Sequence, residues 1–481
     1  MIVPYFLEGF VVILGIVLLM TDAFSKIDKN IVAWTAVVWL GLIFAATFFL
    51  APLPEAWADS GFYVLDSYSL FFKRFLLLAT ILTLILSIDY GSVFLRYVPS
   101  AAPQAGLGEF FTLPVFACAG LMWMVSSADF IMIFVSLELV TISFYVLVAS
   151  MRNNLSSLEA GVKYLILGAL STGFLVYGIT WVFGLTNQTS LLKLADVLPL
   201  VQEGYHSAVL FGLGLIIVAL GFKIAAVPFQ FWVPDVYQGA PTPITAYLSV
   251  ASKAAGFVVL LRVLGPFLEV PFFRDKIIGI FTILAAVTLI LGNLAALPQS
   301  NLKRLLAYSS VAHAGYLLVG VASITGSALA ADAIAFYLGG YLVMTFLSFF
   351  VLVNVSKVMG GDDIVNFNGL ARRSPILAGA MLLSMLSLAG MPFTIGFFGK
   401  FFIFQSAMES RQYLLVVIGF VTVACGFYYY LKVVRAMYWQ PAPEGSSPIV
   451  VTVSGKLLIG ILSFAIIFFG IFPQPILNLL R

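Results

Sequence analysis

The chain has 481 residues, of which 62% are hydrophobic and only 9% are charged. This composition excludes a soluble globular protein, because so few polar residues cannot cover an apolar core, and it predicts a polytopic membrane protein surrounded by lipid. The formal net charge of +3 is too small and too dispersed to indicate a nucleic-acid partner. Cys118 and Cys425 each lie in an apolar run, which favours core packing over a disulfide or a metal site.

Apolar runs of about 20 residues between glycine, proline and charge clusters predict an all-α protein with fourteen transmembrane helices. The first run lacks a basic segment before it and a cleavage site after it, so we expect it to be kept as a helix. The predicted helices span 4–21, 31–50, 67–89, 109–126, 128–150, 157–184, 207–231, 242–264, 275–297, 303–325, 329–356, 376–406, 411–435 and 455–478.

Basic residues in the predicted loops lie mostly on one side of the membrane, and the positive-inside rule makes that side cytoplasmic. An even number of helices then places both termini outside. Three cations near predicted outer helix ends, Lys73, Arg74 and Arg262, are expected to snorkel toward the membrane surface. The cytoplasmic set is Lys26, Lys29, Arg96, Arg152, Lys303, Arg304, Lys357, Arg372, Arg373, Lys432, Arg435 and Lys456, and the outer set is Lys193, Arg274, Lys276, Arg411 and Arg481.

The sequence also indicates a duplication. Pro392 in MPF follows Pro228 in VPF by 164 residues, which is five predicted helices. An odd number of spans reverses orientation in the membrane, so helices 4–8 and 9–13 are expected to form two inverted repeats. The predicted organisation is 1–108 (three helices), 109–264 (first repeat), 265–440 (second repeat) and 441–481 (last helix).

Each of these prolines removes a backbone amide, which frees the carbonyls of Ile224 and Leu388 inside predicted helices seven and twelve. Broken backbone at membrane depth needs a polar or watery lining. Lys223 is next to the first freed carbonyl, and Lys400 follows the second break by two turns. A kink that serves only packing is the alternative.

Lysines within apolar spans are expensive, because a cation there costs roughly 2.5 to 3.5 kcal/mol. Lys163, Lys223, Lys253 and Lys400 lie within predicted spans, with Lys73 nearer an edge. The default interpretation is a function that needs a titratable amine.

Glu138 lies in the middle of a predicted helix, where its natural partner is Lys223. A close pair favours both charges, whereas separation and burial favour the neutral amine, so the pair is predicted to act as a proton switch. A static buried ion pair is the alternative. Glu159 and Lys163 are four residues apart, which fits either a local salt bridge or a role in modulating this switch.

Lys253 is central in its predicted helix, which contains no acid, and is expected to be neutral part of the time. His313 lies in the segment YSSVAHAGY at 308–316. An imidazole flanked by hydroxyls can relay protons, although a lone buried histidine is also compatible with a purely hydrogen-bonded core residue.

Four stretches resemble one family: GFKIAAVPFQFWVPDVYQGAPTP at 221–243, SLEL at 136–139, NLKRLLAYSS at 301–310 and AGMPFTIGFFGKF at 389–401. They are similar to the antiporter-like membrane subunits of respiratory complex I, and the similarity extends over all fourteen helices. Within that family, Lys253, Lys400 and the absence of a long lateral C-terminal helix resemble the subunit N branch.

The resemblance implies proton translocation in a bacterial inner membrane, driven by quinone reduction in other subunits. Glu138, Lys223, Lys253 and Lys400 match functional positions of the family, and Lys163 matches its helix-six lysine. The chain would be part of an enzyme, NADH:quinone oxidoreductase, without a redox centre of its own. FMN, iron–sulfur clusters, NADH and quinone would be bound elsewhere in the complex, whose other membrane subunits would be its partners.

Both lines of reasoning predict a proton route from the cytoplasm to Lys223, through Lys253 and the region of His313, and out by way of Lys400. Two alternatives stay open. The chain could be a subunit of a multi-subunit cation/proton antiporter, or a scaffold that packs against pumping neighbours and tolerates neutral residues at Lys223 and Lys400.

Overall fold

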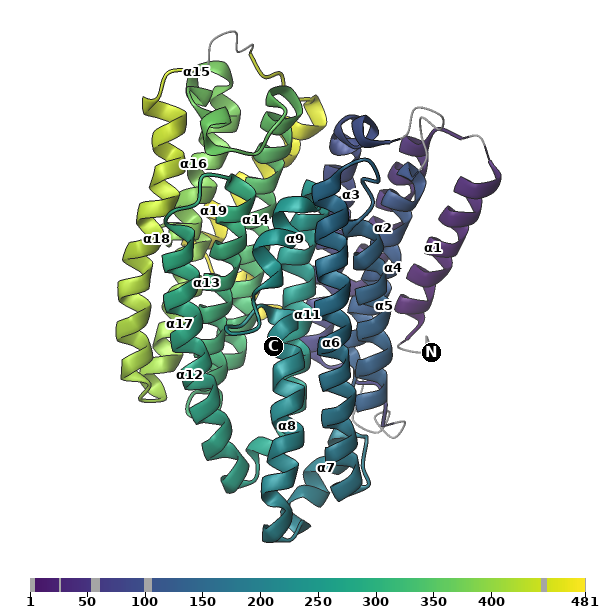
Figure 1. Cartoon of the computed structure of the whole chain (residues 1–481), viewed down its shortest axis with the longest axis vertical. Coiled ribbons are helices and arrows are strands. Elements are labelled where there is room, and N and C mark those ends of the chain that lie inside the picture. The colour runs from purple at the N-terminus through teal and green to yellow at the C-terminus, as the bar shows by residue number, and fades with distance from the viewer. Residues whose placement is uncertain (1–4, 26, 53–60, 99–105, 443–447, 481) are drawn as a thin grey trace. The chain divides into compact units, whose positions relative to one another are not determined.

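The computed structural model describes residues 5–25, 27–52, 61–98, 106–442 and 448–480. Within these ranges the chain is helical, and its only β-type pairing is three isolated bridges. Figure 1 shows the helices as long rods joined by short loops. The principal helices are α1 (Phe6–Phe24), α2 (Lys29–Ala46), α3 (Ser67–Phe94), α4 (Leu107–Ser126), α5 (Phe130–Val148), α6 (Leu155–Thr186), α7 (Leu191–Val197), α8 (Glu203–Ile224), α9 (Trp232–Gly239), α10 (Thr242–Tyr247), α11 (Lys253–Leu268), α12 (Pro271–Ala296), α13 (Leu302–Ala322), α14 (Ala330–Met359), α15 (Leu370–Arg373), α16 (Pro375–Ala389), α17 (Ile395–Glu409), α18 (Tyr413–Trp439), α19 (Val453–Ile471) and α20 (Gln474–Asn478).

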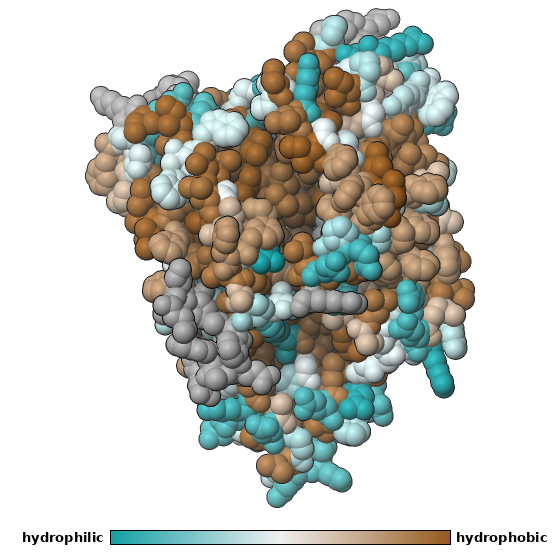
Figure 2. Space-filling model, turned by 180° about the vertical axis from the view of Figure 1, so that it is seen from behind, coloured by the Kyte–Doolittle hydropathy of each residue, from teal (hydrophilic) through white to brown (hydrophobic). Residues whose placement is uncertain are grey.

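The predicted membrane spans are confirmed with one change of form. Among the described residues, 13 helices are long and apolar enough to cross a membrane, with α10 and α11 counted as one, and α16 is a shorter apolar helix. The predicted span 376–406 consists of two helices, α16 and α17. Hydrophobic residues cover much of the middle of the face in Figure 2, as expected for a surface in contact with lipid. Pro4, Lys26 and Arg481, to which we assigned a helix start or a side of the membrane, lie outside the described residues.

The chain forms two compact units, and each unit consists of two separate segments of the sequence. The first unit contains Met1–Ala225 and Gly239–Gly279, and the second contains Ala226–Gln238 and Ile280–Arg481. The segment after the first break therefore belongs to the second unit, where the Arg304 guanidinium donates to the Asp235 carboxylate at 2.8 Å. The inverted repeats with the boundary at 264 stay a prediction.

The most buried helices of each unit carry two of the predicted ionisable residues, Lys253 and His313. In the first unit, the span Thr242–Leu268 is almost entirely buried, and it contacts α3, α4 and α8. In the second unit, α13 and α14 are buried to the same degree, and α14 also packs against α16 and α17. Side chains on these helices are shielded from lipid, so an ionisable group there must be satisfied by the protein or by water.

Both predicted breaks are present. The prediction of one helix over 207–231 is wrong, because α8 begins at Glu203 and ends at Ile224, with Ala225 in the left-handed conformation. Pro228 cannot continue the helical hydrogen bonding beyond this point. At the second break, α16 ends at Ala389, and Gly390 adopts φ +94°, a conformation that glycine tolerates. A π-helical segment, Leu248–Ser252, directly precedes Lys253 and was not predicted.

Candidate functional site

Lys223 lies at the end of α8, one residue before the first break. Its side chain is only 4% exposed. Its amine has no hydrogen-bond partner in the part of the chain that the structure describes. A cation in such a place is stabilised poorly, so Lys223 is suited to exist as a neutral amine for part of the time.

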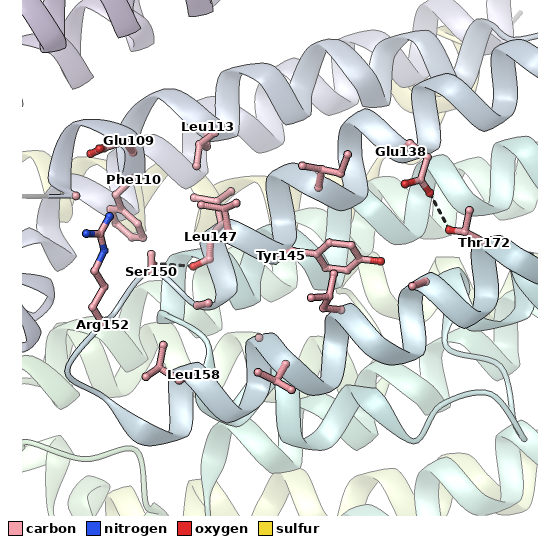
Figure 3. Close-up of a pocket in the computed structure, with 18 residues that line it drawn as sticks. Glu109, Phe110, Leu113, Glu138, Tyr145, Leu147, Ser150, Arg152, Leu158 and Thr172 are labelled. Atoms are coloured by element: carbon pink, nitrogen blue, oxygen red, sulfur yellow. Dashed lines mark hydrogen bonds between the residues drawn. The ribbon is translucent and has the colours of Figure 1, made fainter.

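Glu138 and Lys223 do not form a direct ion pair in this structure, although their charges are close enough to interact electrostatically. Within the described ranges no ion pair joins the two residues at the 4.0 Å limit. Glu138 is half-buried on α5, and its Oε1 accepts a hydrogen bond of 2.7 Å from the Thr172 hydroxyl on α6. Figure 3 shows the Glu138 carboxylate and Thr172 facing each other across the two helices. The direct hydrogen-bond partner, Thr172, was not predicted, because the side chain of Glu138 is directed to α6.

A small cavity lies between Thr172 and the amine-bearing side chain. It measures ≈ 10 Å³ and is lined by Leu137, Thr141, Gly168, Ser171, Thr172, Leu175, Ala219, Phe222 and Lys223. That volume has room for about one water molecule, and the site offers hydroxyl groups as partners. Thr172 therefore contacts Glu138 directly and borders the space that Lys223 also borders.

A larger groove opens on the other side of Glu138. It has a volume of ≈ 1130 Å³ and lies among α4, α5 and α6. Figure 3 shows Glu109 and Arg152 at one end of this groove and Glu138 with Thr172 at the other. Most of the wall between them is apolar, so the groove is suited to a hydrocarbon chain or an apolar helix rather than to a column of water.

Lys253 begins α11 and is buried in the first unit. Gly256, one turn later, is the point where α11 meets α8. A Cβ atom at Gly256 would lie 2.8 Å from Ile224 Cγ2 and 3.4 Å from Lys223 Cγ. The first unit therefore places Glu138 on α5, Lys223 on α8 and Lys253 on α11. Helix α8 packs against α11, and α6 packs against both α5 and α8.

Lys163 forms the local salt bridge that was one of its two predicted interpretations. Its Nζ lies 2.7 Å from Glu159 Oε1, and the two side chains are 41% and 66% exposed. The local i, i+4 salt bridge is therefore present on an exposed face of α6. A role for Lys163 in proton transfer stays a prediction.

In the second unit, His313 on α13 is held by two tyrosines. Its Nδ1 lies 2.6 Å from the Tyr337 hydroxyl and its Nε2 lies 3.1 Å from the Tyr430 hydroxyl. Because a neutral imidazole has one donor and one acceptor nitrogen, one tyrosine donates to the ring and the other accepts from it. These partners come from α14 and α18, and sequence reasoning missed both because it looked only at the hydroxyls beside His313.

Lys400 on α17 fills the second break. Its Nζ donates to the carbonyls of Leu388, at 3.0 Å, and Ala389, at 2.8 Å. The carbonyl of Leu388 is the one that we expected Pro392 to leave free. The amine also lies 5.0 Å from the centre of the Tyr316 ring, and that ring is 6.2 Å from the His313 ring. The second unit therefore brings His313 and Lys400 together around Tyr316.

Two cations that we expected near the membrane surface are buried instead. Lys73 does not snorkel: its Nζ lies 2.7 Å from Glu8 Oε1, and both side chains are 0% exposed. Lys303 is buried 3.6 Å from the Asp362 carboxylate. Sequence reasoning missed Glu8 as a site residue, although a carboxylate within the first apolar run is itself a signal.

No group of three or more His, Cys, Asp or Glu residues in the described ranges could hold a metal ion.

The chain was compared with known families and proteins. The family described as NADH:quinone oxidoreductase/Mrp antiporter, TM, matches residues 127–426. Proteins named NADH-quinone oxidoreductase subunit N are similar over most of their length. The one from Dehalococcoides mccartyi is 36% identical, covering 98% of this chain and 97% of the relative. The one from Moorella thermoacetica is 40% identical, covering 94% and 91%.

Solved structures agree with these relatives. A chain of respiratory complex I from Thermus thermophilus has a TM-score of 0.80 and 30% identity, with 98% of both chains covered. A chain of the Mrp complex from Dietzia sp. has a TM-score of 0.81 at 19% identity, covering 100% of this chain and 96% of the other, and shows the fold alone. The predicted family and the predicted fold class are confirmed. The chain belongs to the antiporter-like membrane subunits of NADH:quinone oxidoreductase, within the subunit N family.

Proposed function

We propose that this chain moves protons across a bacterial membrane as a subunit of NADH:quinone oxidoreductase. The relatives that carry the family assignment are named as subunit N of that enzyme. The observation that carries the proposal is the same in both units. Lys223 and Lys400 are buried at the ends of broken helices, and neither forms an ion pair with a described residue.

A buried lysine without a counter-ion is a poor structural element. Truncating or neutralising Lys223 would remove a desolvation penalty without losing a hydrogen bond, so packing gives no reason for its amine. Lys400 also caps the carbonyls of Leu388 and Ala389, so its variants must separate the two roles. The ammonium and the neutral amine are close enough in free energy for the local field to choose between them. An amine of this kind can accept and release a proton during turnover.

Glu138 is the residue through which that field can be altered. Its side chain is half-buried and lines the groove of Figure 3. The carboxylate accepts a hydrogen bond from the Thr172 hydroxyl, and Thr172 also lines the small cavity beside Lys223. A charge on a neighbouring subunit beside this groove would compete with Lys223 for the carboxylate. At an effective dielectric constant of 20, two unit charges interact by about 4 kcal/mol at 4 Å, and by less at the longer separation of Glu138 and Lys223. Moving one charge against 100 mV costs about 2.3 kcal/mol, so such a change is sufficient to gate a proton.

The proposed route has four stations. Protons load from the cytoplasm onto Lys223, continue by Lys253 to the region of His313, and leave by way of Lys400. Lys163, at the cytoplasmic end of α6, adjusts the field at the loading site. Both termini lie outside, as inferred from the distribution of lysine and arginine among the loops.

The redox chemistry belongs to other subunits. NADH, FMN, iron–sulfur clusters and quinone would be bound there, and this chain would contact other membrane subunits in the inner membrane. A subunit of a cation/proton antiporter is the second candidate, favoured by the shared fold with the Mrp complex. That candidate predicts sodium-dependent exchange in vesicles without flavin or clusters. An inert scaffold predicts normal pumping after neutral replacement of Lys223 and Lys400.

Lys223→Met tests the proposal in the complete complex, reconstituted into proteoliposomes. Assembly is verified by native electrophoresis and by NADH oxidation with an artificial electron acceptor. NADH-driven pumping should fall on the order of tenfold or more, because losing a positioned proton-transfer group typically costs roughly 10²- to 10⁴-fold. Lys193→Met, which removes an exposed cation on α7, is the matched control and should pump normally. Normal pumping by an assembled Lys223→Met complex would contradict the proposal.

A further inference from the structure

A second buried group of ionisable side chains lies in the first unit, away from Lys223. Glu8 of α1 and Lys73 of α3 form an ion pair of 2.7 Å in which both side chains are fully buried. The Tyr63 hydroxyl donates to Glu8 at 3.2 Å and accepts a hydrogen bond from Lys73. Three groups that can each hold or pass a proton are therefore in direct contact.

This group leads from the interior to the surface. Tyr63 is half-buried in the loop before α3. Asp66, three residues further on, is 42% exposed and pairs with Arg262 of α11 at 2.9 Å. Burial acts to raise the pKa of Asp66, but the Arg262 guanidinium and the hydrogen bond from the Ser69 amide outweigh it, so the pKa lies below its ordinary value. Asp66 therefore stays ionised at the exit and does not trap a proton there.

Tyr63 is suited to be the link between the buried pair and the outside. Burial and the Glu8 carboxylate raise the pKa of Tyr63 well above its ordinary value. The phenol therefore keeps its proton. It can pass protons only by accepting one while donating another, as a hydroxyl in a relay does.

Attachment of α1 does not explain the ion pair. Leu7, Val11 and Leu18 of α1 are buried, and α1 packs against α2 and α4 through its apolar face. A buried ion pair can often be replaced by well-packed apolar residues without loss of stability. An ionisable residue inside a membrane protein is a functional candidate by default.

Hydroxyl groups approach the pair from the interior of the same unit. The Thr80 hydroxyl, two turns along α3 from Lys73, lies 2.8 Å from the Tyr247 hydroxyl of α10. Tyr247 is followed by the π-helical segment Leu248–Ser252 and then by Lys253. A local π-helix is frequent at functional sites. Transfer between Thr80 and Lys73 spans about 10 Å along the helix and needs bound water.

We propose that Glu8 and Lys73 form a proton-holding site at the outer end of the first unit, and that protons leave it past Tyr63. This inference rests on the proposed function. The Lys73 ammonium gives its proton to the Glu8 carboxylate, either directly or with Tyr63 accepting one proton and donating another. The acid then loses its proton to water outside, and a proton from the interior restores the ammonium. One proton moves outward and every side chain returns to its starting form.

Lys73→Arg separates this site from a structural ion pair. Arginine keeps the positive charge and the pairing with Glu8, but it does not deprotonate in proteins. In the reconstituted complex, pumping and quinone reduction should fall roughly tenfold together, while NADH oxidation with an artificial acceptor is unchanged. An assembled Lys73→Arg complex that pumps at half the normal rate or more would overturn the proposal.

A double variant, Glu8→Leu with Lys73→Met, covers the case in which arginine does not fit. It removes both charges, so it should assemble and still fail to pump. Normal pumping by the double variant, or failure of both Lys73→Arg and the double variant to assemble, would mean that the ion pair only holds α1 in place. The Asp22→Asn, Lys29→Gln pair is the control, since it removes a partly exposed ion pair of 2.6 Å between α1 and α2.

Lys400→Met is measured in the same assay. If Lys400→Met stops pumping and Lys73→Arg does not, only the outer site of the first unit is refuted. If neither variant changes pumping, the proposed function itself is refuted.

Discussion

Replacing Lys400 tests whether its amine carries protons or only caps a helix. The geometry of the side chain is compatible with both roles. The side chain is buried, and its Nζ donates to the carbonyls of Leu388 and Ala389 at the end of α16. Arginine keeps the charge and the donors, but it does not deprotonate in proteins. Methionine removes charge and donors together.

The structure gives a magnitude for the loss of stability. Lys400→Met removes two hydrogen bonds from a charged donor, about 1.5 to 3 kcal/mol each. It also removes a cation from the membrane interior, which returns about 2.5 to 3.5 kcal/mol. The net destabilisation is about 0 to 3 kcal/mol, so the variant should assemble. Lys400→Arg should be no less stable, apart from crowding near Gly390, where a Cβ would already lie 3.0 Å from Lys400 Cδ.

Pumping is measured as NADH-driven acidification of proteoliposomes, with the amount of assembled complex fixed by NADH oxidation with an artificial acceptor. Both variants should lose pumping by on the order of tenfold or more, and quinone reduction should fall with it. The refuting result is specific. If Lys400→Arg pumps normally and Lys400→Met does not, Lys400 is a helix cap and protons leave elsewhere.

Three further predictions concern the first unit and the topology. Glu138→Asp should keep more pumping activity than Glu138→Gln, because aspartate keeps the charge. Adding Lys223→Met to Glu138→Gln should reduce activity little further, because the effects of residues that act as one unit are not additive. Equal activities of the two Glu138 variants would show that the charge of Glu138 is not used. Thr172→Val removes a hydrogen bond to a carboxylate worth about 1.5 to 3 kcal/mol and should slow pumping, whereas Thr172→Ser should restore it; a normal rate for the valine variant would exclude Thr172 as the link. In a background without native cysteines, Val365→Cys should react with an impermeant thiol reagent only from the cytoplasm and Leu200→Cys only from outside; labelling with the sides exchanged would reverse the orientation.

The sequence was informative about spans and breaks because those signals are local. Hydrophobic run length marks a helix, and a proline fixes which carbonyl loses its partner, so the place of Lys400 near Leu388 could be predicted and is confirmed. Partners across helices could not be predicted. Glu8 and Lys73 are 65 residues apart in the chain and meet only because α1 and α3 both pack against α4.

The same limit applies to the direct hydrogen-bond partner of Glu138. The sequence shows one acid and one nearby lysine in adjoining spans, and Coulomb attraction favours pairing them. Rotation of a helix about its axis decides which face a side chain takes, and here Glu138 meets Thr172 instead. For His313, the tyrosines that hold its ring come from helices 24 and 117 residues further along the chain, beyond the reach of any local pattern.

Gly256 shows how an uncharged position can limit the evolution of a proton route. Its missing side chain lets α11 approach α8 until the backbone touches Ile224 and the stem of Lys223. Any larger residue would widen the spacing between the helices that carry Lys223 and Lys253. In the proposed route, a wider spacing would slow proton transfer between Lys223 and Lys253, so we expect substitution at Gly256 to reduce pumping although the position carries no charge. A search for the residues that fix the pumping rate should therefore include helix contacts that carry no charge.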